Sequence, residues 1–148
     1  MNPVILIRIL IGLIFVVSGG EKLLSPYQNF LYVIQAYEIV PSPWDEWVAR
    51  IFPWMEFFWG IFTVVGLWTI WSLRGLLLST SCFLFVVGQA LWRNLPIEKC
   101  GCFGGLVSIP LPTILLMDAV MWIYIAYLII RIERSHRFSL DEYFSKQS

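Results

Sequence analysis

The chain has 148 residues, of which 59% are hydrophobic and 14% charged, with a formal net charge of zero and a mean hydropathy of +0.76. Soluble domains carry about one-quarter charged residues, so this composition excludes an ordinary soluble domain and predicts an integral membrane protein. The length fits a single domain over residues 1–148, and the balanced charge provides no basic surface for nucleic acid.

Four segments are long and apolar enough to span a membrane. A transmembrane helix needs about 20 mostly apolar residues to cross roughly 30 Å of hydrocarbon. The four candidate segments lie at about residues 4–20, 51–71, 75–92 and 111–130. No clear cleavage site follows the first segment, so we expect it to be retained as a span. The predicted fold is an all-α bundle of four transmembrane helices.

The connection between the first two spans contains a predicted amphipathic helix at about residues 26–39. Ser25 and Pro26 are typical of a helix start, and Pro41 and Pro43 are expected to end it. Its apolar residues recur at helical spacing: Tyr27, Phe30, Leu31 and Ile34. We expect this helix to lie along the outer membrane interface, and a cap on the bundle is the alternative.

The later connections differ in length and content. A short turn at residues 72–74 predicts that the second and third spans are antiparallel neighbours. The loop at residues 93–110 is rich in turn formers and holds two of the three cysteines. Residues 131–148 form a polar tail with several basic residues. The basic tail favours cytoplasmic termini, which puts the 93–110 loop on the periplasmic or extracellular side of the cell (inner) membrane.

Many tryptophans fall near the predicted ends of the spans. They are Trp44, Trp47, Trp54, Trp68, Trp71 and Trp92. Tryptophans at these depths are typical of the aromatic belts that lie at the level of lipid headgroups, so most need no ligand to explain them.

Cys100 and Cys102 flank Gly101 in the loop that we place on the oxidising side of the membrane. Residues two apart in an extended chain have Cα atoms about 6 to 7 Å apart, so a disulfide between them needs a tight turn at Gly101. So small a ring would be strained and easily reduced, which suits an exchanging redox pair. Two unpaired thiols, or thiols that pair with another chain, are the alternatives.

Three other residues of chemical interest have simpler explanations. A metal site at the cysteine loop is disfavoured, because tetrahedral zinc needs four ligands and the only histidine, His136, follows the last span. Cys82 falls within the third span, where we expect a small buried apolar residue. Arg8 lies within the first span near its inner end, and we expect its side chain to extend to the membrane surface.

Polar side chains recur near the outer end of every span. Lys22 follows the first span, Glu56 and Asp118 lie in the second and fourth, and Gln89 lies in the third. An ionisable residue costs about 2.5 to 3.5 kcal/mol at the centre of an inserting helix, so such residues need a reason. Two explanations stay open. Lys22 ties helices together by pairing with one of the acids, or the acids move protons for thiol or quinone chemistry.

The chain resembles the methylamine-utilisation MauE family, within the wider DoxX-like group of small four-span membrane proteins. The resemblance covers most of the chain. It is carried by Arg8 with Gly12 and Phe15, Ser18 to Leu23, Pro53 to Glu56, Gly60, Gly66 to Trp68, and Cys100 to Gly104. The cysteine motif is the most specific of these.

This resemblance implies a redox-associated membrane role. The MauE family is required to make active methylamine dehydrogenase and is associated with disulfide formation in its small subunit, and DoxX-like relatives include subunits of quinone-linked sulfur oxidation. Cys100 and Cys102 would be the redox pair, with Lys22 and Glu56 at polar positions like those of the family. The chain departs from the Cys-x-x-Cys pairs of other disulfide-generating membrane proteins. A periplasmic thioredoxin-like partner could supply the missing thiols.

We therefore expect a thiol–disulfide oxidoreductase of the membrane, with a quinone as the candidate electron acceptor, in which Cys100 and Cys102 exchange electrons with a dithiol of a periplasmic partner or client. Glu56, Asp118 and Lys22 are candidates for proton transfer or for tuning the pKa of a thiol. A candidate quinone region contains Gln89, Trp54, Trp92 and Phe103. The alternative is a non-catalytic membrane subunit or assembly factor that docks a partner through the cysteine loop.

Overall fold

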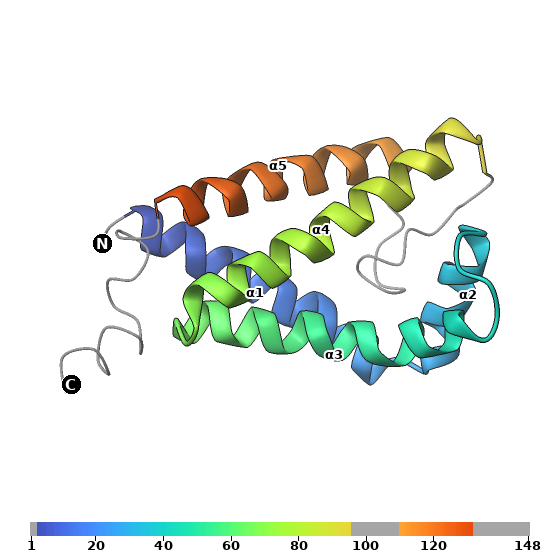
Figure 1. The fold of residues 1–148 in the computed structure, drawn as a ribbon, viewed down its shortest axis with the longest axis horizontal. Helices are drawn as coiled ribbons and strands as arrows, with labels where there is room; N and C mark the ends of the chain where they lie inside the picture. The colour runs from blue at the N-terminus through green and yellow to red at the C-terminus, as the bar shows by residue number, and fades with distance from the viewer. Residues whose placement is uncertain (1–2, 96–109, 132–148) are drawn as a thin grey trace.

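The computed structural model describes residues 3–95 and 110–131, which form five α-helices (Figure 1). Four of these helices are long and apolar enough to cross a membrane, which confirms the predicted four-helix membrane bundle. They are α1 (Pro3–Leu24), α3 (Trp44–Val65), α4 (Thr69–Trp92) and α5 (Leu111–Ile130). The predicted short helix of the first connection is present as α2 (Tyr27–Ala36).

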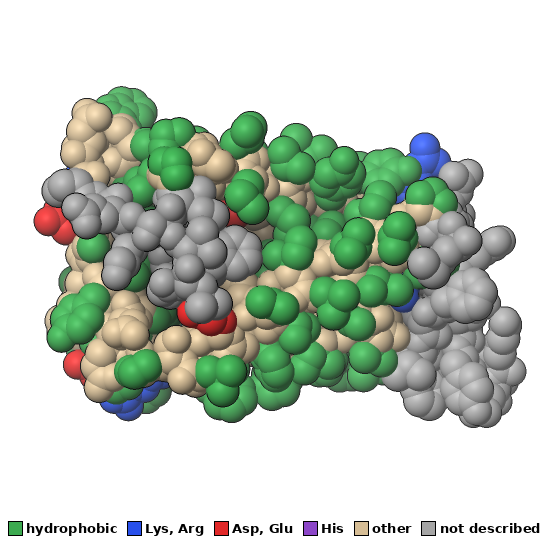
Figure 2. Space-filling view, turned by 180° about the vertical axis from the view of Figure 1, so that it is seen from behind, with side chains coloured by type: hydrophobic (Ala, Val, Ile, Leu, Met, Phe, Trp, Pro, Cys, Tyr) green, Lys and Arg blue, Asp and Glu red, His purple; other side chains and the backbone are tan. Residues whose placement is uncertain are grey.

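The long helices run up and down alternately along the bundle. The start of α1 and the end of α5 lie together at one end, while α2 and the junction of α4 with α5 lie at the other (Figure 1). Hydrophobic side chains cover the middle of the visible face, and most charged side chains gather towards its ends (Figure 2). This distribution suits a multi-pass membrane protein, whose middle contacts lipid tails.

All six tryptophans assigned to aromatic belts are exposed. Their side chains belong to α3, α4 and the turn between them: Trp44, Trp47, Trp54, Trp68, Trp71 and Trp92. Five of them lie near a helix end, as a headgroup-level position requires, since one part of the indole contacts lipid and its N–H contacts water. Trp54 lies near the middle of α3.

The turn between the second and third spans lies earlier than the sequence suggested. Helix α3 starts at Trp44 instead of near Ile51 and ends at Val65. Gly66 follows in the left-handed conformation, with φ of 75°, and its N–H donates a hydrogen bond to the Phe62 carbonyl at 2.8 Å. Glycine adopts this conformation without steric cost, which explains where the helix stops. The predicted turn at residues 72–74 is therefore wrong, and these residues belong to α4.

Helix α2 packs against the end of the bundle. Its contacts are with α3 and α1, and its buried residue Phe30 stacks on Phe52 of α3 with ring centroids 6.4 Å apart. The helix begins at Tyr27 after Pro26 and has no side-chain cap, so Ser25 does not cap it as expected. These contacts are compatible with both the predicted interfacial placement and a cap on the bundle.

The α1–α3 interface is packed closely around glycines. A Cβ atom added to Gly60 would lie 2.8 Å from the Val16 backbone nitrogen, and one added to Gly19 would lie 2.8 Å from that of Phe57. Small residues let transmembrane helices approach until their backbones touch. This interface therefore holds the turns of α1 around Val16 and Gly19 closely against α3.

Helices α4 and α5 meet through two separate hydrophobic clusters. One cluster joins them to α1 and contains Val4, Ile11, Phe15, Leu73, Leu76, Ile125 and Leu128. The other lies nearer to α2 and contains Tyr37, Val87, Ala90 and Leu111. Between the clusters, the indole N–H of Trp122 donates a hydrogen bond to Ser81 Oγ at 2.9 Å. This intermediate stretch of both helices also borders a cavity lined by Thr80 and Asp118.

Candidate functional site

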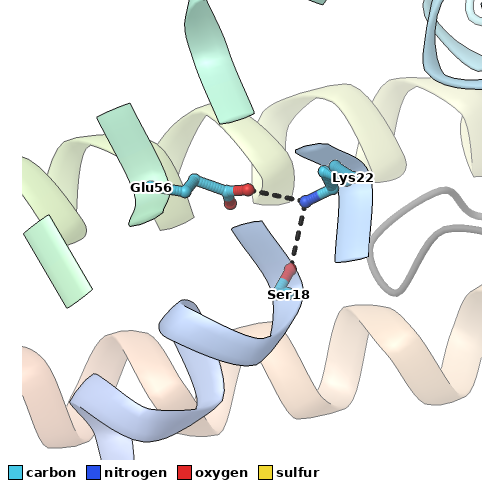
Figure 3. A network of polar contacts seen from close by, with 3 residues as sticks. All are labelled: Ser18, Lys22 and Glu56. Atoms are coloured by element: carbon cyan, nitrogen blue, oxygen red, sulfur yellow. Dashed lines mark hydrogen bonds and ion pairs between the residues drawn. The ribbon is translucent and has the colours of Figure 1, made fainter. Parts of the chain in front are cut away.

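A buried ion pair joins α1 to α3. The Nζ of Lys22 lies 2.6 Å from Oε2 of Glu56, and both side chains are only 1% exposed. Lys22 also donates a hydrogen bond to Ser18 Oγ, one helical turn earlier, at 3.1 Å (Figure 3). The predicted convergence of polar groups is thus real for these helices, and the partner of Lys22 is Glu56 rather than Asp118.

Aromatic rings surround the ammonium group of Lys22. Its Nζ lies 5.4 Å from the ring centroid of Phe30 and 5.1 Å from that of Phe83. Phe52 lies against both rings and meets Phe83 edge-on at 5.4 Å. Rings at these distances attract a cation and exclude water. The ion pair is therefore enclosed by α2, α3 and α4, in surroundings where charges interact strongly.

Asp118 on α5 belongs to the same group of charges. It borders the same cavity as Glu56 and lies close enough to Glu56 and Lys22 to interact electrostatically with both. Its Oδ2 atom is buried and has no hydrogen-bond partner among the described residues. Lys22 thus forms an ion pair with Glu56 and a weaker electrostatic interaction with Asp118. Because Lys22 is engaged by Glu56, Asp118 is the group still able to take a partner from a ligand.

The cavity has a volume of about 400 Å³ and touches all four long helices. Its polar wall is formed by Ser18, Glu56, Thr80 and Asp118. The rest of the wall is apolar and comes mainly from α1 and α5. A mostly apolar cavity with a few converging polar groups is typical of a small-molecule site.

The structure brings together only two of the three described residues of the predicted quinone region. Gln89 and Trp92 line a separate groove along α4, together with Arg93. Trp54 is 52% exposed and stacks on Phe58 of its own helix, with centroids 5.9 Å apart. Trp54 borders neither that groove nor the cavity at Asp118. Phe103, the fourth member, lies outside the described residues.

Cys100 and Cys102 also lie outside the described residues. The described residues that flank their loop are Leu95, after the end of α4, and Pro110, before α5. These attachment points lie at the end of the bundle where α2 packs (Figure 1). The Lys22–Glu56 pair lies towards the same end, because Lys22 is in the last turn of α1.

Two expectations about single residues are wrong. Arg8 does not extend to the membrane surface: it is 1% exposed, because its face of α1 points into the bundle. Cys82 is not buried in the core but exposed on α4. It borders a second apolar cavity of about 330 Å³, which Phe30 and Phe83 also line.

Sequence reasoning missed the uncharged members of the site. Ser18 was named only as the first residue of a segment that carries the family resemblance, and Thr80 had no distinguishing signal within an apolar span. Phe30 and Phe83 resemble many other aromatic residues of the chain until the fold brings them to Lys22. Only the charged residues could be singled out, because only they carry an evident cost in a membrane.

The family model for the methylamine utilisation protein MauE matches residues 2–131. The chain belongs to the MauE family. The match covers all five helices and the segment with Cys100 and Cys102. Membership of the MauE family links this membrane protein to methylamine utilisation. No curated protein and no solved structure gives a significant match.

Proposed function

We propose that this MauE-family protein is a membrane thiol–disulfide oxidoreductase that forms disulfides in a periplasmic partner. The carrying observation is the charged group of the buried residues Lys22 and Glu56 and the half-buried Asp118 in the transmembrane helices, towards the end of the bundle where the Cys100–Cys102 loop is attached. Charges buried at a cost in a membrane mark functional sites by default. Two cysteines in the segment attached at that end of the bundle suit redox chemistry.

The reaction has two balanced steps. A dithiol of the partner attacks the Cys100–Cys102 disulfide, so the partner gains a disulfide and the two cysteines become thiols. These thiols then give two electrons and two protons to a quinone of the bilayer, which becomes a quinol. The Cys100–Cys102 disulfide is restored, and the protein is ready for another partner.

The buried carboxyl groups provide a path for protons. Thiol oxidation releases two protons and quinone reduction consumes two, so groups that exchange protons must lie between the two reactions. Glu56 and Asp118 border the cavity and are the candidates for this role. Lys22 neutralises the charge of Glu56 and holds its carboxylate in place.

The same proposal includes an orientation. Both termini are cytoplasmic and the cysteine loop faces the periplasm, where a thioredoxin-like protein or the client itself reaches it. This orientation rests on the basic residues that follow α5, because positively charged segments stay on the cytoplasmic side.

Partner oxidation in reconstituted membranes tests the proposal. With quinone present, vesicles carrying the protein should convert the thiols of an added reduced thioredoxin-like protein to a disulfide, measured by loss of alkylation. Cys100→Ser and Cys102→Ser should each abolish this activity. Cys82→Ser is the matched control and should retain it, because Cys82 lies on α4, separate from the loop. Equal activity in all three variants would overturn the proposal.

A non-catalytic assembly factor is the competing function. The observation that favours it is the Lys22–Glu56 pair, which joins α1 to α3 and would stabilise the bundle without any chemistry. On this account the cysteine loop docks a partner, and serine variants of both cysteines would still support assembly of that partner. The vesicle assay separates the two functions, because docking alone oxidises no thiols.

A further inference from the structure

The cavity beside Asp118 opens on the side of the bundle rather than at its end. Leu13 and Val17 of α1 and Met117 of α5 border it and are 44%, 60% and 42% exposed. All three lie within membrane-spanning helices, so the opening between α1 and α5 faces lipid. A ligand that enters here must come from the bilayer.

Among the described residues, one buried polar atom of the cavity wall has no hydrogen-bond partner. The Thr80 hydroxyl donates to the Leu76 carbonyl at 2.8 Å, and Ser18 Oγ accepts from Lys22. Asp118 Oδ2 is buried without a hydrogen-bond partner among the described residues. A buried polar atom left unpaired costs free energy. A ligand with a polar group at this point would remove that cost.

We propose that this cavity binds the ring of a membrane quinone, with the isoprenoid tail passing between α1 and α5 into the lipid and Asp118 hydrogen-bonded to a ring oxygen. The inference rests on the proposed function, which requires a two-electron acceptor in the bilayer. A volume of about 400 Å³ falls within the usual size range of small-ligand sites.

A quinone fits this cavity better than a phospholipid does. The acidic groups at the inner end would repel a phosphate, and an acyl chain would leave Asp118 Oδ2 unpaired. A quinone ring has two oxygens that accept a hydrogen bond before reduction and donate one afterwards. A carboxyl group can match both states by giving up its proton and taking it back.

Asp118 therefore acts in the quinone half of the reaction. As two electrons pass from the thiols of Cys100 and Cys102 to the ring, the carboxyl of Asp118 gives one proton to a ring oxygen. It is then reprotonated with a proton released by the thiols. The second thiol proton reaches the other ring oxygen, so quinol and disulfide form without net proton exchange.

Photolabelling tests this site independently of the thiol chemistry. The Cys100→Ser/Cys102→Ser variant in nanodiscs is labelled with a short-tailed azidoquinone, and labelled peptides are mapped by mass spectrometry. We expect saturable labelling of residues 10–18 and 114–121 that excess decylubiquinone abolishes. Because this variant has no redox pair, binding can succeed even if the proposed function fails.

Four further variants make the test specific. Asp118→Leu is similar in size but has no hydrogen-bonding atom in its side chain, so it should weaken quinone binding roughly tenfold, as loss of one buried hydrogen-bond partner predicts. Met117→Trp should block the opening and abolish labelling, whereas Met117→Leu should not. Phe85→Leu, on the α4 groove of Gln89, should leave binding unchanged.

Three results would overturn the inference. One is labelling concentrated at Gln89 and Trp92, which would put the quinone in the α4 groove. Another is labelling that phospholipid suppresses and decylubiquinone does not, which would make the cavity a lipid site. The third is equal affinity in the wild type and in the Asp118→Leu variant.

Discussion

Helix α1 has two very different sides. Towards α3, glycines bring the two backbones into contact and the Lys22–Glu56 pair joins the helices with side chains 1% exposed. Towards α5, a cavity of about 400 Å³ separates parts of the helices and contains an unpaired oxygen of Asp118, as judged from the described residues. Tight packing is stabilising, whereas a cavity with an unpaired polar atom is not.

This difference separates the part of the bundle that maintains the fold from the part available for chemistry. Both sides contain a carboxyl group with a buried oxygen, but among the described residues only that of Glu56 has a cation bound to it. We expect substitutions on the α3 side to lower the free energy of unfolding strongly. Substitutions on the α5 side should change ligand binding while leaving that free energy nearly the same.

Glu56→Gln should have the largest effect on stability. It leaves the Lys22 ammonium buried without its counter-ion, which typically costs about 3 to 5 kcal/mol of unfolding free energy. Denaturation in mixed micelles, followed by circular dichroism, measures this loss. Glu46→Gln is the matched control on the same helix, because its side chain is 52% exposed and its contact with Arg50 is 4.0 Å long.

A double variant shows whether the first loss comes from the pair. Lys22→Met combined with Glu56→Gln removes both charges, so it should recover much of the stability that Glu56→Gln loses. If Glu56→Gln and Glu46→Gln cost the same, the ion pair does not hold the α1–α3 side together.

Gly60→Ala should come next. The added Cβ would lie 2.8 Å from the Val16 nitrogen, so the backbones must separate, and overpacking of this kind costs about 1 to 3 kcal/mol. The same denaturation experiment in micelles measures it. Gly88→Ala is the control on α4, where a Cβ meets nothing within 4 Å. A similar result for both glycines would contradict close packing of α1 on α3.

Phe83→Leu tests the boundary between the two sides. Its ring lies 5.1 Å from Lys22 Nζ and also lines the cavity. Loss of the cation–π contact should lower the free energy of unfolding by about 0.5 to 2 kcal/mol. Phe85→Leu, on the same helix but 68% exposed, should cost less. The interaction is refuted if Phe83→Leu is as stable as the variant at Phe85.

Asp118→Asn should have the smallest effect on stability. No described residue is hydrogen-bonded to its buried Oδ2, so the free energy of unfolding should change by less than about 0.5 kcal/mol. Measuring its unfolding in parallel with Glu56→Gln gives the sharpest form of the comparison. A loss as large as that of Glu56→Gln would show that Asp118 contributes to stability as the Lys22–Glu56 ion pair does.

The spans could be predicted from sequence, but their ends could not. Hydropathy marks residues that contact lipid, whereas a helix continues into the headgroup region, as α3 does between Trp44 and Ile51. The polar residues Asp45 and Glu46 lower the hydropathy of this part of α3, so hydropathy alone did not mark the start of the helix. The short turn at Gly66 lies among apolar residues, where only the glycine itself marks the helix end.

The site could be predicted in part. The cost of buried charge identified Lys22, Glu56 and Asp118, and the fold brings them together. Which acid pairs with Lys22 depends on how α1 is rotated against α3, and the close contacts at Gly19 and Gly60 determine that rotation. Gln89 was grouped with them on depth alone, but its side chain faces another groove. The depth of a residue in the membrane can be estimated from the sequence, whereas the direction of its side chain depends on how the helices pack.

The redox state of Cys100 and Cys102 tests the central claim most directly. Differential alkylation and mass spectrometry on isolated membranes, across a series of buffered thiol potentials, measures it in a Cys82→Ser background that leaves only these two thiols. The account predicts a reversible two-electron transition in which both cysteines change together. Thiols that remain free at every potential would contradict a thiol–disulfide oxidoreductase and would favour a membrane assembly factor.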